Sequence, residues 1–114
     1  PVTPAPVTHI AVVNNDDAEP LWLIEVSDEA LTVRTTDFLA ESAENDYELW
    51  MVPANGEAPI SLGVLPETGQ WATNVPDILR SPDISALAVS KEPPGGSPNG
   101  APTEVLYISP LTAV

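Results

Sequence analysis

The sequence predicts an all-β protein, an antiparallel β-sandwich of about seven short strands with at most one short helical turn. Two observations carry this prediction. Apolar segments of six or seven residues, rich in valine, isoleucine, leucine, threonine or tryptophan, recur along the chain. Turn-forming residues separate these segments, in the pattern typical of sandwiches and barrels. With 114 residues, 43% of them hydrophobic, the chain is long enough for one modest core.

Alternating side chains assign faces to the early strands. In the segment 21–27, Trp22, Ile24 and Val26 occupy alternate positions and therefore share one face. In the next segment Leu31 and Val33 take the inward positions. The full set of expected strands is 8–13, 21–27, 30–36, 47–52, 60–65, 84–90 and 104–109.

The later segments and the turns fit the same fold. Segment 84–90 is apolar on both faces and carries small alanines on one of them, which indicates a central strand with close neighbours. Residues 27–30 form a tight hairpin in this interpretation, and the Asn-Gly pair at 55–56 suits a turn with positive φ. Residues 77–80 fit a single helical turn that ends before Pro82.

The charge of the chain limits the function classes. Three basic and 17 acidic residues give a net charge of −14. Such a surface repels phosphate backbones and anionic headgroups, so we expect no nucleic-acid partner and no binding to a membrane surface. The chain has no cysteine, which excludes disulfides and thiolate metal sites within it. No apolar run approaches the roughly 18 residues of a transmembrane helix.

Metal and cofactor sites find little support. The single histidine, His9, starts a strand without the motif of a catalytic triad, and we interpret it as a surface residue. One histidine and no cysteine leave only carboxylates, which suit harder cations than zinc. The loop 14–20 has the oxygen-rich composition that calcium favours, but it lacks the spacing of a calcium loop and also fits an ordinary turn. We expect no cofactor, and calcium binding by the acidic loops stays open.

Candidate catalytic pairs are equally weak. Ser90 and Lys91 are adjacent in a predicted strand, so their side chains point to opposite faces and cannot readily form a dyad. A chain this acidic also places carboxylates close together by chance, so two pairs that resemble a glycosidase acid and base carry little weight: Glu41 with Glu44, and Asp46 with Glu48. We therefore predict that the protein is not an enzyme.

The three tryptophans support an alternative function. Together with the acidic surface they suggest an extracellular carbohydrate-binding or adhesive β-sandwich module, in which the rings stack on sugars. Trp22 and Trp50 lie among aliphatic residues in predicted strands, where packing in the core is the better interpretation. Trp71 follows a predicted turn and is the best candidate for an exposed ring.

The proline- and glycine-rich segment 92–102, EPPGGSPNGAP, is the most unusual part of the chain. Gly95 and Gly96 are adjacent, but no Lys-Ser/Thr pair and no helix start follows them, so the segment is not a phosphate-binding loop. Prolines restrict the unfolded chain, and glycines permit tight reversals. We interpret the segment as a rigid connection between two strands.

Two stretches, 47–65 and 86–109, together resemble the C-terminal domain of the anti-sigma-K factor family. In that family a tyrosine–x–leucine–tryptophan strand precedes a short hairpin and a serine–leucine–glycine strand. A later strand then enters a proline- and glycine-rich loop, and a final apolar strand follows. The residues that carry the resemblance are Tyr47, Leu49, Trp50, Ser61, Leu62, Gly63, Glu92, Pro93, Gly95, Gly96, Ser97, Pro98, Gly100 and Pro102.

The resemblance implies a non-catalytic, extracytoplasmic sensor or regulatory domain of a single-pass membrane anti-sigma factor. In such proteins a cytoplasmic domain holds an extracytoplasmic-function sigma factor inactive, a transmembrane helix follows, and regulated proteolysis releases the sigma factor. Residues 1–7 would then be a proline-rich linker outside the membrane, and residues 8–114 a single domain. We expect the chain to be part of a longer protein that binds its sigma factor elsewhere, with an envelope protein or a protease as a further candidate partner.

Overall fold

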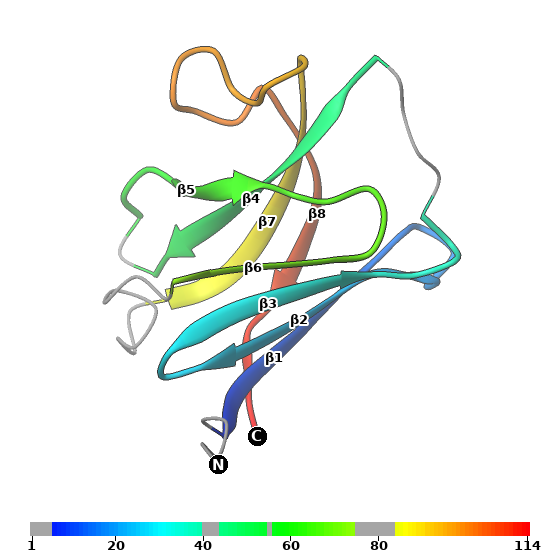
Figure 1. The fold of residues 1–114 in the computed structure, drawn as a ribbon. Coiled ribbons are helices and arrows are strands. Elements are labelled where there is room, and N and C mark those ends of the chain that lie inside the picture. Colours follow the sequence, from blue (N-terminus) through cyan, green and yellow to red (C-terminus); the bar gives the residue numbers. More distant parts are fainter. Residues whose placement is uncertain (1–5, 40–43, 55, 75–83) are drawn as a thin grey trace.

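The computed structural model describes residues 6–39, 44–54, 56–74 and 84–114, and these residues form strands and no helix (Figure 1). The all-β prediction is therefore confirmed. The strands are β1 (Val7–Asn14), β2 (Pro20–Ser27), β3 (Ala30–Thr35), β4 (Asp46–Pro53), β5 (Ile60–Val64), β6 (Gln70–Asn74), β7 (Ile84–Glu92), β8 (Glu104–Pro110) and β9 (Thr112–Ala113).

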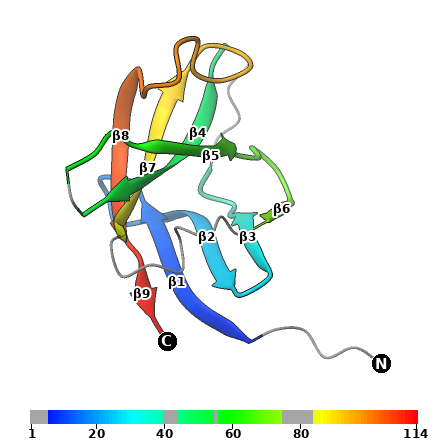
Figure 2. The ribbon, with the colours of Figure 1, turned by 90° about the vertical axis from the view of Figure 1, so that its left-hand side faces the viewer.

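The strands form two antiparallel sheets that pack as a sandwich (Figure 2). A five-stranded sheet has the order β6-β3-β2-β1-β9, and a four-stranded sheet has the order β5-β4-β7-β8. Strands that follow one another in sequence pair as hairpins within β1-β2-β3 and within β4-β5 and β7-β8. The prediction that β7 is a central strand is confirmed, because β4 and β8 flank it.

All seven predicted segments are strands, and the structure adds two more, β6 and β9. Strand β6 pairs with β3 and extends the five-stranded sheet at one edge. The short β9 pairs with β1 at the other edge. The helical turn predicted at 77–80 and the first residue of the Asn-Gly turn, Asn55, lie outside the described residues.

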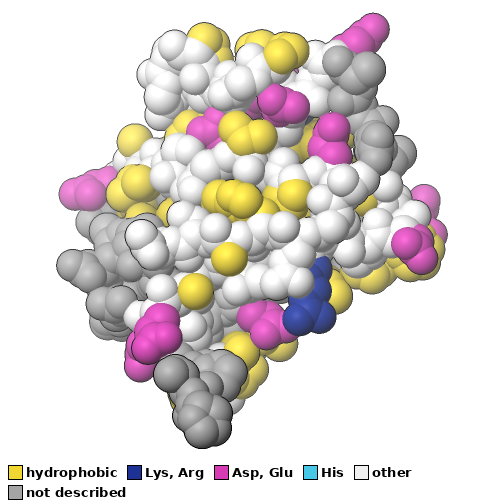
Figure 3. Space-filling view, in the orientation of Figure 1, with side chains coloured by type: hydrophobic (Ala, Val, Ile, Leu, Met, Phe, Trp, Pro, Cys, Tyr) yellow, Lys and Arg dark blue, Asp and Glu magenta, His cyan; other side chains and the backbone are white. Residues whose placement is uncertain are grey.

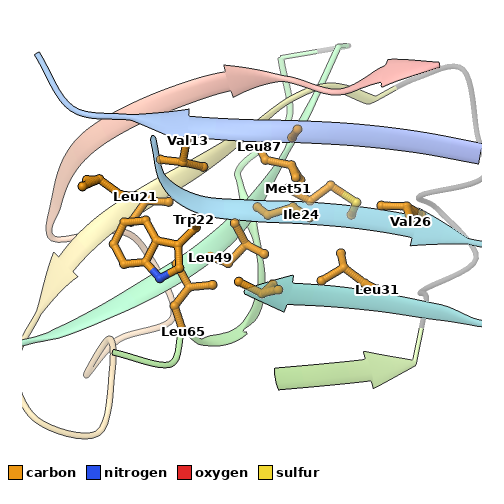
Figure 4. Close-up of a cluster of buried hydrophobic side chains, with 13 residues drawn as sticks. Val13, Leu21, Trp22, Ile24, Val26, Leu31, Leu49, Met51, Leu65 and Leu87 are labelled. Carbon is orange, nitrogen blue, oxygen red and sulfur yellow. The ribbon is translucent and has the colours of Figure 1, made fainter. Parts of the chain in front are cut away.

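The core lies between the two sheets and confirms the predicted faces of the early strands (Figure 4). Trp22, Ile24 and Val26 are buried, as are Leu31 and Val33 of the next strand. Burial of each large apolar side chain contributes about 1.5–3 kcal/mol relative to leaving it exposed. Strands β4 and β7 supply the opposite wall of the core through Leu49, Met51, Leu87 and Val89.

The chain enters and leaves the sandwich at the same end. His9 of β1 pairs with Ala113 of β9, and the Val114 N–H donates to the Thr8 carbonyl over 3.0 Å. The loop between β7 and β8, residues 93–103, lies at the opposite end of the molecule (orange in Figures 1 and 2). We call this segment the β7–β8 loop.

Candidate functional site

Several of the residues singled out in the sequence lie on the outer face of the four-stranded sheet. Leu49 of β4 points into the core, so the residues on either side of it, Glu48 and Trp50, point the other way. The antiparallel register sets Asp46 opposite Glu92 and Glu48 opposite Ser90. The outer face of β4 and β7 therefore carries three carboxylates beside a serine and a tryptophan.

The β7–β8 loop is tied to these carboxylates through its backbone. The N–H of Gly95 donates to Asp46 Oδ2 over 2.7 Å. The N–H of Ser97 donates to Glu48 Oε1, also over 2.7 Å. These contacts bring together residues 49 positions apart in the sequence. The loop therefore folds back onto the outer face at this end of β4 and β7 instead of projecting freely into solvent.

Glu92 is the most buried of the three carboxylates, with 1% of its surface exposed. Thr103, at the far end of the loop, donates to it twice, from its N–H to Oε2 over 2.8 Å and from its hydroxyl to Oε1 over 2.5 Å. The Ser90 hydroxyl donates to Oε2 over 2.5 Å, and Trp50 Nε1 donates in turn to Ser90 Oγ over 2.7 Å. A continuous chain of hydrogen bonds thus links Trp50 to the end of the loop.

This network sets the ionisation of Glu92. Burial by itself would raise the pKa of the carboxyl group, because it penalises the charged form. The hydrogen bonds from Ser90 and Thr103 favour the charged form and lower the pKa below its ordinary value. Glu92 is therefore ionised at neutral pH, and its negative charge strengthens the hydrogen bonds from Ser90 and Thr103.

Glu48 holds the middle of the loop in a similar way. Its exposed fraction is 6%, and the Ser61 hydroxyl of β5 donates to its Oε2 over 2.5 Å. Gly96 packs against it: a Cβ atom at this glycine would lie 2.7 Å from Glu48 Oε1 and 3.1 Å from a methyl group of Val64. The glycine also has φ +101°, which side-chain-bearing residues rarely adopt. Both properties require glycine here.

The remaining signature residues have structural roles. Tyr47 packs edge-on against Trp22, with ring centroids 5.2 Å apart. Leu49 is in the core, and Leu62 packs at its margin. Within the loop, Gly96 N–H closes a turn on the Pro93 carbonyl, and the Ser97 hydroxyl donates to the Ala101 carbonyl. Pro98, Gly100 and Pro102 complete the loop, and Pro98 and Gly100 are exposed.

Trp71 follows a turn, as predicted, but it lies in β6 and its ring is not fully exposed. It lies opposite Val33 of β3 and is half-buried against the core. Its ring sits over Gly63 of β5, where a Cβ atom would lie 3.1 Å from ring atoms. The turn residues before it close the β3–β6 pairing, since Gly69 O accepts hydrogen bonds from the N–H and hydroxyl of Thr35. Trp22 and Trp50 are fully buried, as predicted.

The candidate catalytic residues are engaged in the fold. Ser90 is buried and Lys91 exposed, so the prediction that they face opposite sides of the strand is confirmed. His9 is half-buried at the start of β1, and its Nδ1 lies 3.0 Å from the Thr8 hydroxyl. Glu44 is exposed, and its proposed partner Glu41 lies outside the described residues.

The acidic loop 14–20 forms an ordinary turn. The Asn15 side-chain oxygen accepts hydrogen bonds from the N–H groups of Asp17 and Glu19. The Asn15 amide donates to the Glu19 carboxylate over 3.0 Å. Among the described residues, no group of three or more histidine, cysteine, aspartate or glutamate side chains is placed to hold a metal ion.

Sequence reasoning found the loop but missed what holds it. Asp46 and Glu48 were considered only as a chance carboxylate pair, and Thr103 was not considered. A signal was present, because Asp46, Glu48 and Trp50 alternate along one strand and so share a face. The pairing of this strand with β7, which brings Glu92 alongside, is not visible in the sequence.

Comparison with known proteins gives one match. The family model described as "Anti-sigma-K factor rskA, C-terminal" matches residues 1–106. No curated protein and no solved structure matches the chain. Within the described ranges, no helix has the length and apolar character needed to cross a membrane.

Proposed function

Because this chain belongs to the anti-sigma-K factor family, as its C-terminal domain, we propose that it is the extracytoplasmic sensor or regulatory domain of a single-pass membrane anti-sigma factor. In this proposal the domain acts without catalysis and helps to control an extracytoplasmic-function sigma factor, a form of negative regulation of transcription. The match over residues 1–106 is the observation that carries the proposal.

The geometry of the domain supports this role. Strand β1 begins, and β9 ends, at the end of the sandwich opposite the β7–β8 loop (Figures 1 and 2). If residues 1–7 are the linker to a membrane span, the loop is the part of the domain farthest from the membrane. The surface is strongly acidic, and Figure 3 shows carboxylates spread over one face with a single group of basic atoms. Anionic headgroups would repel such a surface, which favours a domain standing away from the bilayer.

The residues that could do chemistry support a non-catalytic role. Ser90, Glu48 and Glu92 are buried and hydrogen-bonded within the protein, and Glu48 and Glu92 accept hydrogen bonds from the loop. An active site needs a nucleophile or an acid–base group that can reach a substrate. The side chains of Ser90, Glu48 and Glu92 instead make hydrogen bonds within the folded domain.

The placement can be tested with an introduced cysteine, since the chain has none of its own. Ala101 is exposed on the β7–β8 loop, and Ala101→Cys gives the domain a single thiol there. In the full-length protein with any other cysteines replaced, we expect a membrane-impermeant maleimide to label this thiol in intact cells. Labelling only after the membrane is permeabilised would contradict an extracytoplasmic placement. Trp22→Cys, whose side-chain position is buried, is the matched position that should stay unlabelled while the domain is folded.

The regulatory role needs a separate measurement. We expect that replacing residues 8–114 by an unrelated folded domain leaves sigma-factor binding intact but alters the response of a sigma-dependent reporter gene. Co-purification of the sigma factor measures the first property, and reporter output with and without envelope stress measures the second. An unchanged reporter under all conditions would refute a sensor or regulatory role. Comparing the pattern of cleavage fragments in the two proteins tests whether regulated proteolysis depends on the domain.

The carbohydrate-binding alternative loses its stacking platform in this structure. Trp22 is fully buried in the core between the sheets, and Trp50 is fully buried on the outer side of the four-stranded sheet. Trp71 packs its ring over Gly63. No specific observation now favours that function.

A further inference from the structure

We propose that the β7–β8 loop is a strap held closed by the carboxylates of Asp46, Glu48 and Glu92, and that protonation of the buried Glu92 in acid releases the end of the loop from the four-stranded sheet. The proposal goes beyond the proposed function and rests on contacts within this chain alone. It therefore stands or falls independently of where the domain is located.

The ties are distributed along the whole strap. At its beginning Gly95 donates to Asp46, in its middle Ser97 donates to Glu48, and at its end Thr103 donates to Glu92. Every one of these ties is a backbone N–H donating to a carboxylate over 2.7 or 2.8 Å. Hydrogen bonds to an ionised acceptor are roughly twice as strong as those between neutral groups. Each tie therefore depends on the charge of its carboxylate.

Among the described residues of β4, β5, β7, β8 and the strap, no basic side chain shares the face on which the carboxylates lie. Asp46 is directly opposite Glu92 in the register, and Glu48 is two positions along the same face. Lys91 points to the other side of β7, and neither β5 nor the strap contains a titratable residue. The titratable side chains on the surrounding strands are Asp46, Tyr47, Glu48, Lys91, Glu92, Glu104 and Tyr107. The hydrogen-bond donors of the strap therefore lie against all three carboxylates.

The direction of the pH effect follows from Glu92. Its burial opposes ionisation, yet the hydrogen bonds from Ser90 and Thr103 hold its pKa below the ordinary value of 4.5. The folded, closed form therefore binds this proton more weakly than the unfolded chain does. The stabilisation is complete above about pH 4.5 and is lost as the pH falls through the lowered pKa.

Opening would change what the outer face presents. In the closed form Gly96 lies against Glu48 and Val64, and only 6% of the surface of Glu48 is exposed. A released strap gives water or a partner access to Glu48 and to the neighbouring side chain of Val64. The strands themselves keep their core and their ladder hydrogen bonds, because the strap lies outside the sandwich.

Amide hydrogen exchange measured by NMR on this chain tests the proposal residue by residue. The variant Glu92→Gln mimics the protonated acid in shape and charge. At neutral pH we expect it to raise the exchange rate of the Thr103 amide by about tenfold or more, while the strand amides of Leu49 and Leu87 keep their protection. In the unmodified protein the same local increase should appear as the pH falls below 4.5 and through the lowered pKa of Glu92, after correction for the intrinsic exchange rate. Glu104→Gln removes the same charge from an exposed position on β8 and should change neither.

The result that overturns the proposal is equally specific. If the Thr103 amide stays as protected as the strand amides in Glu92→Gln at neutral pH and throughout the acid titration of the unmodified protein, the charge of Glu92 does not hold the strap. If Glu92→Gln fails to fold, Glu48→Gln and the acid titration of the unmodified protein decide the matter. Loss of protection at the strap only together with global unfolding, seen by circular dichroism, would also refute a separate opening.

Discussion

At the scale of single residues, the glycines of the β7–β8 loop differ in what they do. Gly95 and Gly96 both have positive φ, +93° and +101°. A Cβ atom at Gly95 would meet nothing within 4 Å, whereas one at Gly96 would collide with the Glu48 carboxylate. Gly95 is therefore required by its backbone conformation alone, and Gly96 also by the close approach of the loop to β4.

This difference gives a matched pair of variants. We expect Gly95→Ala to lower the free energy of unfolding by about 1–2 kcal/mol, the cost of a strained backbone. Gly96→Ala should cost about 1–3 kcal/mol more, because it also forces the loop away from Glu48 and Val64. Urea unfolding of the two variants measures the difference. Equal losses would mean that the loop does not press on the sheet as the structure describes.

At the scale of the element, β5 and β6 belong to different sheets, and the ring of Trp71 on β6 lies against Gly63 on β5. Gly63 of β5 has φ +131°, and the ring of Trp71 lies where its side chain would be. Trp71 in turn is held in register opposite Val33 of β3. The missing side chain of Gly63 thus makes room for the ring, and the two edge strands close this side of the sandwich.

A double-mutant cycle tests this contact. We expect Gly63→Ala to destabilise the protein by about 1–3 kcal/mol, because the new methyl group overlaps the Trp71 ring and the backbone is strained. In a Trp71→Ala background the overlap is absent, and the cost of Gly63→Ala should fall to the backbone term alone. Thermal unfolding of the four proteins gives the coupling. Additive losses would show that the ring does not occupy the space beside Gly63.

The elements also show how far sequence patterns reach. Strands such as β2 and β3, with apolar side chains at alternate positions, were predicted with their faces. Strand β6, with the sequence QWATN, has one large apolar residue and no such alternation, so nothing distinguishes it from a turn. It becomes a strand because β3 offers it a paired edge, which is a property of the sheet and not of the segment.

At the scale of the whole molecule, the two ends of the sandwich differ. Strand β1 begins and β9 ends at one end, and the carboxylate-bound loop lies at the other (Figure 1). Charge dominates this molecule, with a net charge of −14, and its stability should therefore depend on pH at both extremes. On the acid side, the ionised Glu92 stabilises the folded state, and this stabilisation is lost as the pH falls below 4.5 and through its lowered pKa.

On the alkaline side, Tyr107 of β8 supplies the corresponding term. Its burial raises the pKa of the phenol above 10.0, and the negative charges of Tyr47 and Asp16 raise it further. Above pH 10.0 the unfolded chain loses this proton more readily than the folded one, so stability falls as the pH rises. Tyr107→Phe has no phenol to titrate and should flatten this decline. Melting temperatures between about pH 9 and 11 measure it, and an unchanged slope in the variant would contradict the assignment.

The sequence by itself determined the fold class, the family resemblance and the inner faces of the early strands, because strand alternation and turn chemistry are local. It also predicted that residues 92–102 lead from one strand to the next, and residues 93–103 do connect β7 and β8. Only the tertiary structure decided that Asp46, Glu48 and Glu92 bind that loop. Their arrangement depends on the register between β4 and β7, two strands separated in the chain by residues 54–83. No local pattern encodes such a pairing, which arises when both strands bury their other faces in a common core.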